Sequence, residues 1–221
     1  AWRVFIFLVG VGGGVFVAAN FMIDGVWAGG EGRRGVGGVG SVRGVDGLEG
    51  RQLGAIREVV DVADAAGIEV WLRGGWAMDF HLGEVTRPHV DVDWYCWRRD
   101  AAPLADRLGA LGWRPDPRMP TETQLDLLRG DVELSFAYLD RDADGRVVVG
   151  AGPWAGTLLP DGMLSGPPGR IGAFTAPVIS VGAQIEFKEM FPVWMPERPR
   201  RAKDAADLAR LRGSAGGHPA R

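Results

Sequence analysis

Several residue types that stabilise small secreted or metal-bound proteins are scarce in this sequence. The 221 residues include a single cysteine, Cys96, so no disulfide can form within the chain, which fits a reducing compartment such as the cytoplasm. We expect Cys96 to be a plain buried residue, because free cysteines are among the most buried side chains. The three histidines have no cysteine partners and no zinc-ligand spacing, so the sequence supports no zinc site.

A surplus of basic charge is also missing. Lysine and arginine total 25 against 28 aspartates and glutamates, which gives a net charge of −3 and a pI near 5.7. Proteins that bind nucleic acid through its phosphates usually have a basic surplus. The composition therefore indicates no nucleic-acid partner, and a mildly acidic protein suits a small cationic substrate.

Glycine, in contrast, is abundant, and its distribution separates the first 48 residues from the rest. Fifteen of the 35 glycines fall within the first fifty residues. Residues 4–23 are almost wholly apolar, as in a membrane anchor or a secretory signal, but the glycines inside this run weaken a helix. We therefore favour a disordered or artefactual extension over residues 1–48, with a membrane anchor and a secretory signal as the alternatives.

From residue 49 onward, apolar residues recur with the spacing of a globular domain that contains both helices and strands. We expect a main domain over residues 49–175, a small helical lobe over 176–212 and a disordered tail over 213–221. Helices are expected near residues 48–66, 76–82, 100–111, 181–191 and 202–211. Strands are expected at residues 68–72, 91–97, 123–129, 132–139 and 147–150, and residues 151–175 should be mostly loop.

A glycine pair, Gly74-Gly75, follows the first expected strand and opens a short helix. Glycines allow backbone amides to approach a phosphate closely, and the N-terminus of a helix favours an anion. Two glycines alone are a weak signal. The pair becomes informative because a second motif follows it in the next strand.

That second motif is Asp91-Val92-Asp93. A strand period of two puts both aspartates on one face, about 7 Å apart along the strand. Two such charges repel each other, by about 4 kcal/mol at 4 Å and an effective dielectric constant near 20, unless a cation lies between them. The sequence therefore predicts a divalent-metal site that faces a phosphate-binding loop.

Glu133 is the third acidic position. It alternates with apolar Val132 and Leu134 in a later strand, so it can share the face of Asp91 and Asp93 if the two strands are neighbours. It could complete a Mg²⁺ site or act as a general base for an acceptor hydroxyl. Taken alone, a solvated position on the outer face of a hairpin is the simpler interpretation.

With these residues in view, the sequence resembles the nucleotidyltransferase fold of the polymerase-beta type. Gly-Gly followed by Asp-x-Asp is the motif of that fold. The longer string at residues 71–94 is similar to the branch that contains aminoglycoside 2''-adenylyltransferases and lincosamide adenylyltransferases: WLRGGWAMDFHLGEVTRPHVDVDW. The resemblance covers about residues 50–211, includes Gln184, Lys188, Lys203, Asp204 and Asp207, and leaves residues 1–48 without a counterpart.

The resemblance implies a fold and a set of roles. The fold would be an α/β (α+β) nucleotidyltransferase with a mixed, mainly antiparallel sheet flanked by helices, in which 49–175 is the catalytic domain. Asp91 and Asp93 would bind Mg²⁺, and Glu133 would stand at the position of the base, which is often Asp in this branch. The nucleotide phosphates would contact Gly74, Gly75, Lys188 and Arg87, although Arg87 and His89 could equally order their own loop.

Two further sets of residues are expected to be structural. Asp79 should fix the loop at residues 86–89, and Lys203, Asp204 and Asp207 should brace the last helix.

The implied activity is Mg²⁺-dependent transfer of AMP from ATP to a hydroxyl of a small molecule, with release of pyrophosphate. An aminoglycoside-like cation is the preferred acceptor, and we expect a cytoplasmic protein with no nucleic-acid or membrane partner. A lincosamide or another small hydroxyl acceptor, a protein-modifying (antitoxin-like) nucleotidyltransferase and a non-enzymatic nucleotide-binding protein are the alternatives.

Overall fold

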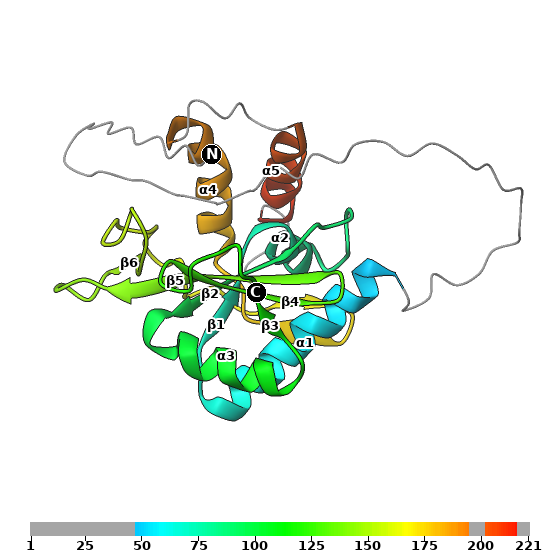
Figure 1. Ribbon diagram of the computed structural model, residues 1–221. Helices are drawn as coiled ribbons and strands as arrows, with labels where there is room; N and C mark the ends of the chain where they lie inside the picture. Colours follow the sequence, from blue (N-terminus) through cyan, green and yellow to red (C-terminus); the bar gives the residue numbers. More distant parts are fainter. Residues whose placement is uncertain (1–46, 195–201, 216–221) are drawn as a thin grey trace, which may run out of the picture.

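The computed structural model describes residues 47–194 and 202–215 (Figure 1). Nearly all of the expected extension over residues 1–48, and the end of the expected tail, lie outside the described residues. The helices are α1 (Leu48–Ala66), α2 (Gly74–Leu82), α3 (Ala101–Ala110), α4 (Val181–Trp194) and α5 (Ala202–Ala215), with a 3-10 turn η1 (Arg98–Asp100). The strands are β1 (Val70–Leu72), β2 (Val92–Trp97), β3 (Arg114–Pro115), β4 (Gln124–Arg129), β5 (Val132–Arg141), β6 (Val147–Val149), β7 (Gly169–Ile171) and β8 (Phe174–Ala176).

Several boundaries differ from the sequence-based expectation, and three of them bear on the site or on the expected tail. Helix α2 begins at Gly74, two residues early, because the glycine pair itself forms the first turn after an extended Arg73. Strand β2 begins at Val92, so Asp91 lies just before the strand. Helix α5 continues to Ala215, into the stretch expected to be a disordered tail, because it is rich in alanine, leucine and arginine, which favour helix.

The main sheet has the strand order β1-β2-β5-β4-β3, and β6 pairs with the far end of β5. Only the central pair β2–β5 is parallel among the pairings of the described strands, and the others are antiparallel. The expected mixed, mainly antiparallel sheet flanked by helices is therefore confirmed. The parallel pair places the start of β2 beside the start of β5, with Val92 opposite Leu134.

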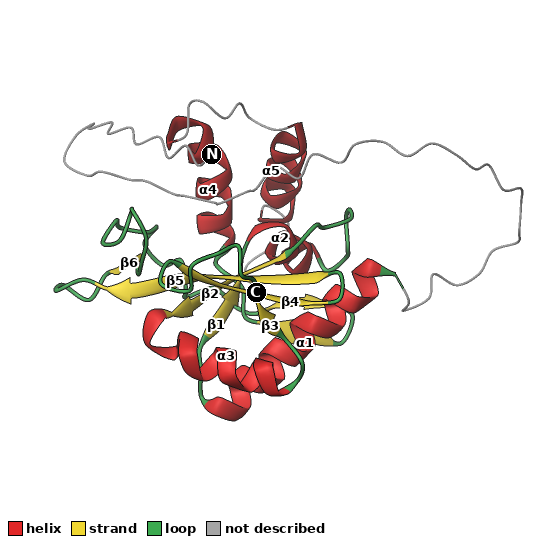
Figure 2. Ribbon diagram, in the orientation of Figure 1, coloured by secondary structure: helices red, strands yellow, loops and turns green. Residues whose placement is uncertain are grey.

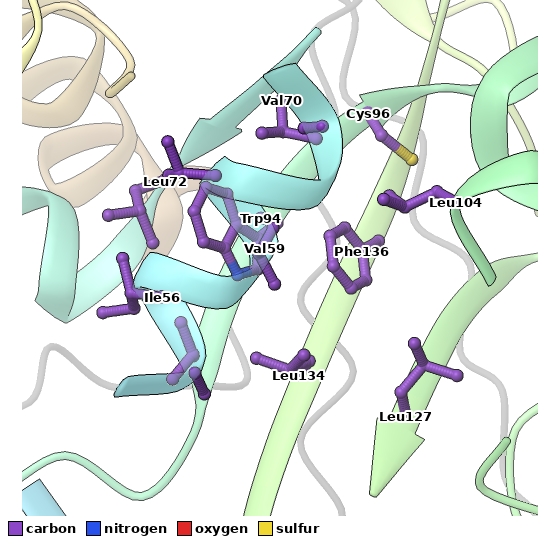
Figure 3. Close-up of a cluster of buried hydrophobic side chains, with 14 of the residues drawn as sticks. Ile56, Val59, Val70, Leu72, Trp94, Cys96, Leu104, Leu127, Leu134 and Phe136 are labelled. Atoms are coloured by element: carbon purple, nitrogen blue, oxygen red, sulfur yellow. The ribbon is translucent and has the colours of Figure 1, made fainter. Parts of the chain in front are cut away.

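One face of the sheet packs against α1 and α3 to form the main hydrophobic core (Figures 1 and 3). Trp94 and Phe136 stack at the centre of this core, and Ile56 of α1 and Leu104 of α3 close it from the helix side. Cys96 is fully buried here, and burial raises the pKa of its thiol to about 12, so it is the inert core residue that we expected.

The opposite face of the sheet divides into an apolar half and a polar half. Trp71, Tyr95 and Trp97 form a second cluster with Ala183 and Phe187 of α4. The polar half lies over the beginnings of β2 and β5 and over β4. Helices α4 and α5 stand together on this side, and both contact α2 (Figure 2).

The C-terminal helices correspond to the expected lobe, whose boundary at residue 175 stays a prediction. The chain keeps contact with the sheet just after that point, because Val178 forms a β-bridge with Leu72. Within residues 47–194 and 202–215, no helix combines the length and the apolar character needed to cross a membrane.

Candidate active site

Gly74 and Gly75 open α2 where the chain approaches the beginning of β2. Gly74 has a φ of +68°, which residues with a side chain rarely adopt. A β-carbon on Gly74 would lie 2.6 Å from Asp93 Oδ2, and one on Gly75 would overlap the imidazole of His89. Both positions require glycine because no space is left for a side chain. The first turn of α2 therefore lies directly against the Asp93 carboxylate.

The two aspartates of the expected metal pair lie on the polar half of the sheet. Val92 between them is buried in the main core, so Asp91 and Asp93 project from the other face. Burial, and next the charge of Asp93, raise the pKa of the Asp91 carboxyl to about 6. The repulsion inferred from the sequence thus has a counterpart in the structure, and a cation between the carboxylates would relieve it.

Glu133 lies on the same polar half. Because β2 and β5 are parallel and Val92 is opposite Leu134, the residues before them, Asp91 and Glu133, lie at the same level. Burial, and next the charge of Asp126, raise the pKa of Glu133, while Arg118 acts in the opposite direction. Arg118 Nη2 lies 3.6 Å from Glu133 Oε2, and the glutamate side chain is 36% exposed, so it remains accessible.

Asp126 is an acidic residue of this surface that the sequence did not single out. Asp93, Ser135 and Asp126 are opposite one another across β2, β5 and β4. Ser135 Oγ donates to Asp126 Oδ1 at 2.7 Å, and Gln124 Nε2 donates to Asp126 Oδ2 at 2.7 Å. The alternation of Gln124 and Asp126 with buried leucines could have indicated that both face away from the core. The register of β2, β5 and β4, which brings Asp126 level with Asp93, is set only by the fold.

Arg73 is the second residue that the sequence left without a role. Its guanidinium is buried beside the acidic pair, with Nη2 2.9 Å from Asp93 Oδ1. Its Nε donates to the main-chain oxygen of Trp94 at 3.3 Å, and the group lies over the Tyr95 ring, 5.1 Å from the centroid. The acidic surface therefore contains a fixed positive charge of its own.

Asp91 and Asp93 offer hard oxygen ligands, which suit Mg²⁺. In the part of the chain that the structure describes, no group of three or more His, Cys, Asp or Glu side chains is placed to hold a metal. The three-carboxylate site, one of the two options considered for Glu133, is thus not assembled there. Two carboxylates fit an ion that takes its remaining ligands from water and substrate phosphates.

The loop that precedes Asp91 is held by the buried carboxylate of Asp79. Thr86 donates to it through its hydroxyl at 2.6 Å and its amide at 3.2 Å, and His89 Nε2 lies 2.6 Å away. His89 also packs on Trp76, with ring centroids 4.6 Å apart. Asp79 therefore has the structural position that we expected. In this structure His89 orders the loop, and Arg87 Nη1 lies 3.1 Å from its Nδ1.

Helices α4 and α5 reach the glycine pair through a second polar network. Gln184 of α4 donates to the main-chain oxygen of Gly74. Lys188 Nζ lies 2.7 Å from Asp207 Oδ2, and Arg87 Nη2 lies 3.4 Å from the same oxygen. One buried carboxylate thus brings together the two cations expected to contact phosphates, and Arg87 Nη2 lies 3.0 Å from where a β-carbon on Gly75 would be. Asp207 has the bracing position expected for it.

Residues 55–211, well over half of the chain, match the family described as aminoglycoside-2''-adenylyltransferase. The chain belongs to this family. Curated 2''-aminoglycoside nucleotidyltransferases from Klebsiella pneumoniae and Escherichia coli are each 45% identical to it over 38 residues, which is 17% of this chain and 22% of the relative. The chain therefore aligns with only about a fifth of the length of these relatives.

Solved structures support the fold of an aminoglycoside-2''-adenylyltransferase. The solution structure of ANT(2'')-Ia superimposes with a TM-score of 0.58 at 22% identity, over 76% of this chain and 86% of that protein. The lincomycin-bound crystal structure of the lincosamide adenylyltransferase LnuA gives a TM-score of 0.57 at 19% identity, over 72% and 95%. The nucleotidyltransferase fold expected from the sequence is confirmed.

Proposed function

We propose that this protein transfers AMP from ATP to a hydroxyl group of an aminoglycoside-type antibiotic, releases pyrophosphate and thereby supports antibiotic resistance. The observation that supports this best is the direct contact between the Gly74-Gly75 turn and the Asp93 carboxylate. A phosphate at the N-terminus of α2 would lie next to carboxylates that hold a metal. Membership of the aminoglycoside-2''-adenylyltransferase family supports the same reaction and acceptor class.

In this proposal Asp91 and Asp93 bind Mg²⁺, and Gly74, Gly75 and the Arg87–Lys188 pair surround the triphosphate. The bound metal would neutralise phosphate charge and help orient the leaving pyrophosphate. Lys188 is 10% exposed and already paired with Asp207, so its contact with phosphate requires a shared or exchanged ion pair.

Glu133 is proposed as the base. The acceptor oxygen attacks the α-phosphorus of ATP, the bond to the bridging oxygen of the β-phosphate breaks, and the proton moves to the Glu133 carboxylate. The raised pKa of Glu133 brings its proton affinity closer to neutral pH, which favours this role. Arg118, 3.6 Å away, would keep the carboxylate ionised before the acceptor binds.

The acceptor is proposed to be cationic because the polar half of the sheet is acidic. Four carboxylates lie on this surface: Asp91, Asp93, Asp126 and Glu133. Arg73 offsets only part of their negative charge. An acidic surface concentrates a polycation and favours its binding. We propose the cytoplasm as the site of action, where ATP is available and a lone thiol stays reduced.

The direct test incubates the full chain with ATP, Mg²⁺ and pooled aminoglycosides and follows the products by mass spectrometry. We expect an adenylylated antibiotic and one pyrophosphate per transfer. Asp93→Asn should abolish transfer while its circular-dichroism spectrum stays that of the wild type. Turnover by Asp93→Asn at the wild-type rate would refute the metal role.

Parallel reactions separate the other acceptors. Adenylylated lincomycin without adenylylated aminoglycoside would change the substrate but keep the chemistry. A protein that gains the mass of AMP, while no antibiotic does, would identify a protein-modifying enzyme. Absence of pyrophosphate with every acceptor, despite ATP binding, would identify a nucleotide-binding protein and refute the proposal.

A further inference from the structure

Arg73 lies where a cation is unusual for a metal-dependent site. Its side chain is 10% exposed, and the guanidinium contacts Asp93 Oδ1, the main-chain oxygen of Trp94 and the face of Tyr95. Arginine stays charged even when buried. The residue therefore places a permanent positive charge inside the acidic surface.

The two carboxylate oxygens of Asp93 lie against different groups, Arg73 and Gly74. Oδ1 lies 2.9 Å from Arg73 Nη2, in an ion pair. Oδ2 is the oxygen that faces Gly74, at the position where a β-carbon would be 2.6 Å away. Oδ1 thus contacts the guanidinium, and Oδ2 faces the glycine turn where the triphosphate is proposed to bind.

The charges around Arg73 fit this arrangement. Asp91 and Asp93 together contribute two negative charges when ionised, and Arg73 neutralises one of them. Asp91 and Asp126 also act electrostatically on the guanidinium. A divalent ion that enters alone would meet a carboxylate pair of which Arg73 already neutralises half of the negative charge. A bound triphosphate would add negative charge, and this charge would attract the metal ion.

We propose that Arg73 is a resident counter-cation of Asp93, which keeps metal binding weak until the nucleotide is present. This inference rests on the proposed function, because it takes the metal and the triphosphate as the ligands. Its consequence is coupling: metal and nucleotide each bind much more tightly in the presence of the other. Arg73 is thus a positioning residue that sets the strength of this coupling.

The test measures Mn²⁺ binding to the full chain by electron paramagnetic resonance, with and without a non-hydrolysable ATP analogue. Wild type should bind Mn²⁺ weakly alone and tightly with the analogue. Arg73→Gln should tighten nucleotide-free Mn²⁺ binding by at least about tenfold, because an opposing charge is removed. Arg73→Lys keeps the charge and should behave like wild type.

Arg107→Gln is the matched control, because it removes the same charge from the exposed face of α3, on the other side of the sheet. It should leave both affinities unchanged. Unchanged or weaker nucleotide-free binding in Arg73→Gln would overturn the inference. If that variant does not fold, the wild-type protein still provides a test. Equal Mn²⁺ affinity with and without the analogue also overturns the inference.

The outcomes also separate this inference from the proposed function. Strong coupling that depends on Arg73, in a protein that adenylylates no acceptor, supports the role of Arg73 and refutes the proposed transfer. Transfer of AMP to an aminoglycoside with no coupling between metal and nucleotide refutes the role of Arg73 alone. A wild-type protein that binds neither Mn²⁺ nor the analogue refutes both.

Discussion

The ion pair between Lys188 and Asp207 gives a quantitative test of how the C-terminal helices support the site. Asp207→Asn keeps the shape of the side chain but removes its charge. Asp207 is 1% exposed and Lys188 is 10% exposed, so the lysine would be left as a buried cation. Removal of one partner of a buried pair costs about 3–5 kcal/mol. Asp204 Oδ1 remains 3.9 Å from Lys188 Nζ, so we expect the lower end, about 3 kcal/mol.

The assay is urea unfolding at pH 7, followed by tryptophan fluorescence and circular dichroism. The double variant Asp207→Asn/Lys188→Met removes both charges and should be more stable than Asp207→Asn alone, because no unpaired cation is buried. Asp106→Asn on the exposed face of α3 is the control for loss of one negative charge, and it should unfold like wild type.

Two results would refute this reasoning. An unfolding free energy for Asp207→Asn within about 0.5 kcal/mol of wild type would show that the pair contributes little. A double variant less stable than Asp207→Asn would show that Lys188 is stabilised by other contacts. In the same samples the KM for ATP should rise more than kcat falls, because Arg87 and Lys188 lose their common partner.

Three further predictions concern the glycine pair and the acids. Gly74→Ala should lose activity and about 1–3 kcal/mol of stability in urea unfolding, because the new methyl group meets Asp93 Oδ2. Gly54→Ala, in the open middle of α1, is the control and should gain up to about 1 kcal/mol of stability. Glu133→Gln should slow transfer on the order of 10²–10⁴-fold with little change in the KM for ATP, and a loss below tenfold in single-turnover experiments would exclude a base. In the metal-free protein the Asp91 pKa of about 6 exceeds the unfolded value of about 3.9. Folded protein then holds the proton more tightly, so the unfolding free energy should fall by up to about 3 kcal/mol as the pH rises from about 4 to 6. Asp91→Asn should reduce that slope, and a slope equal to that of the wild type would contradict the assignment.

The part of the site that lies within one stretch of chain could be predicted from the sequence. Gly74, Gly75, Asp91 and Asp93 lie within twenty residues, and a strand period of two is enough to put both aspartates on one face. The positions of the helices and strands also followed from apolar spacing, with errors at ends where a glycine turn or a continuing helix set the boundary.

The remainder depends on contacts between distant segments, which a periodic pattern does not encode. Asp126 faces the site because β4 is antiparallel to β5 in one particular register, and a shift of one residue would turn it into the core. Arg73 could have been taken for an ordinary strand-end residue, since its partners Asp93 and Tyr95 belong to another strand. The pairing of Lys188 with Asp207 required the packing of α4 against α5.

The place of Asp207 in α5, well beyond the two motif segments, has a consequence for truncated forms of the protein. A stop codon or frameshift between the end of α4 and the start of α5 would leave all the described strands and both motif segments encoded, yet the product would lack the carboxylate that pairs with Lys188 and Arg87. Such a truncated protein would contain an unpaired cation beside the glycine turn. Loss of α5 should therefore impair activity as a change in the segment from Gly74 to Asp93 does, although more than a hundred residues separate the two segments.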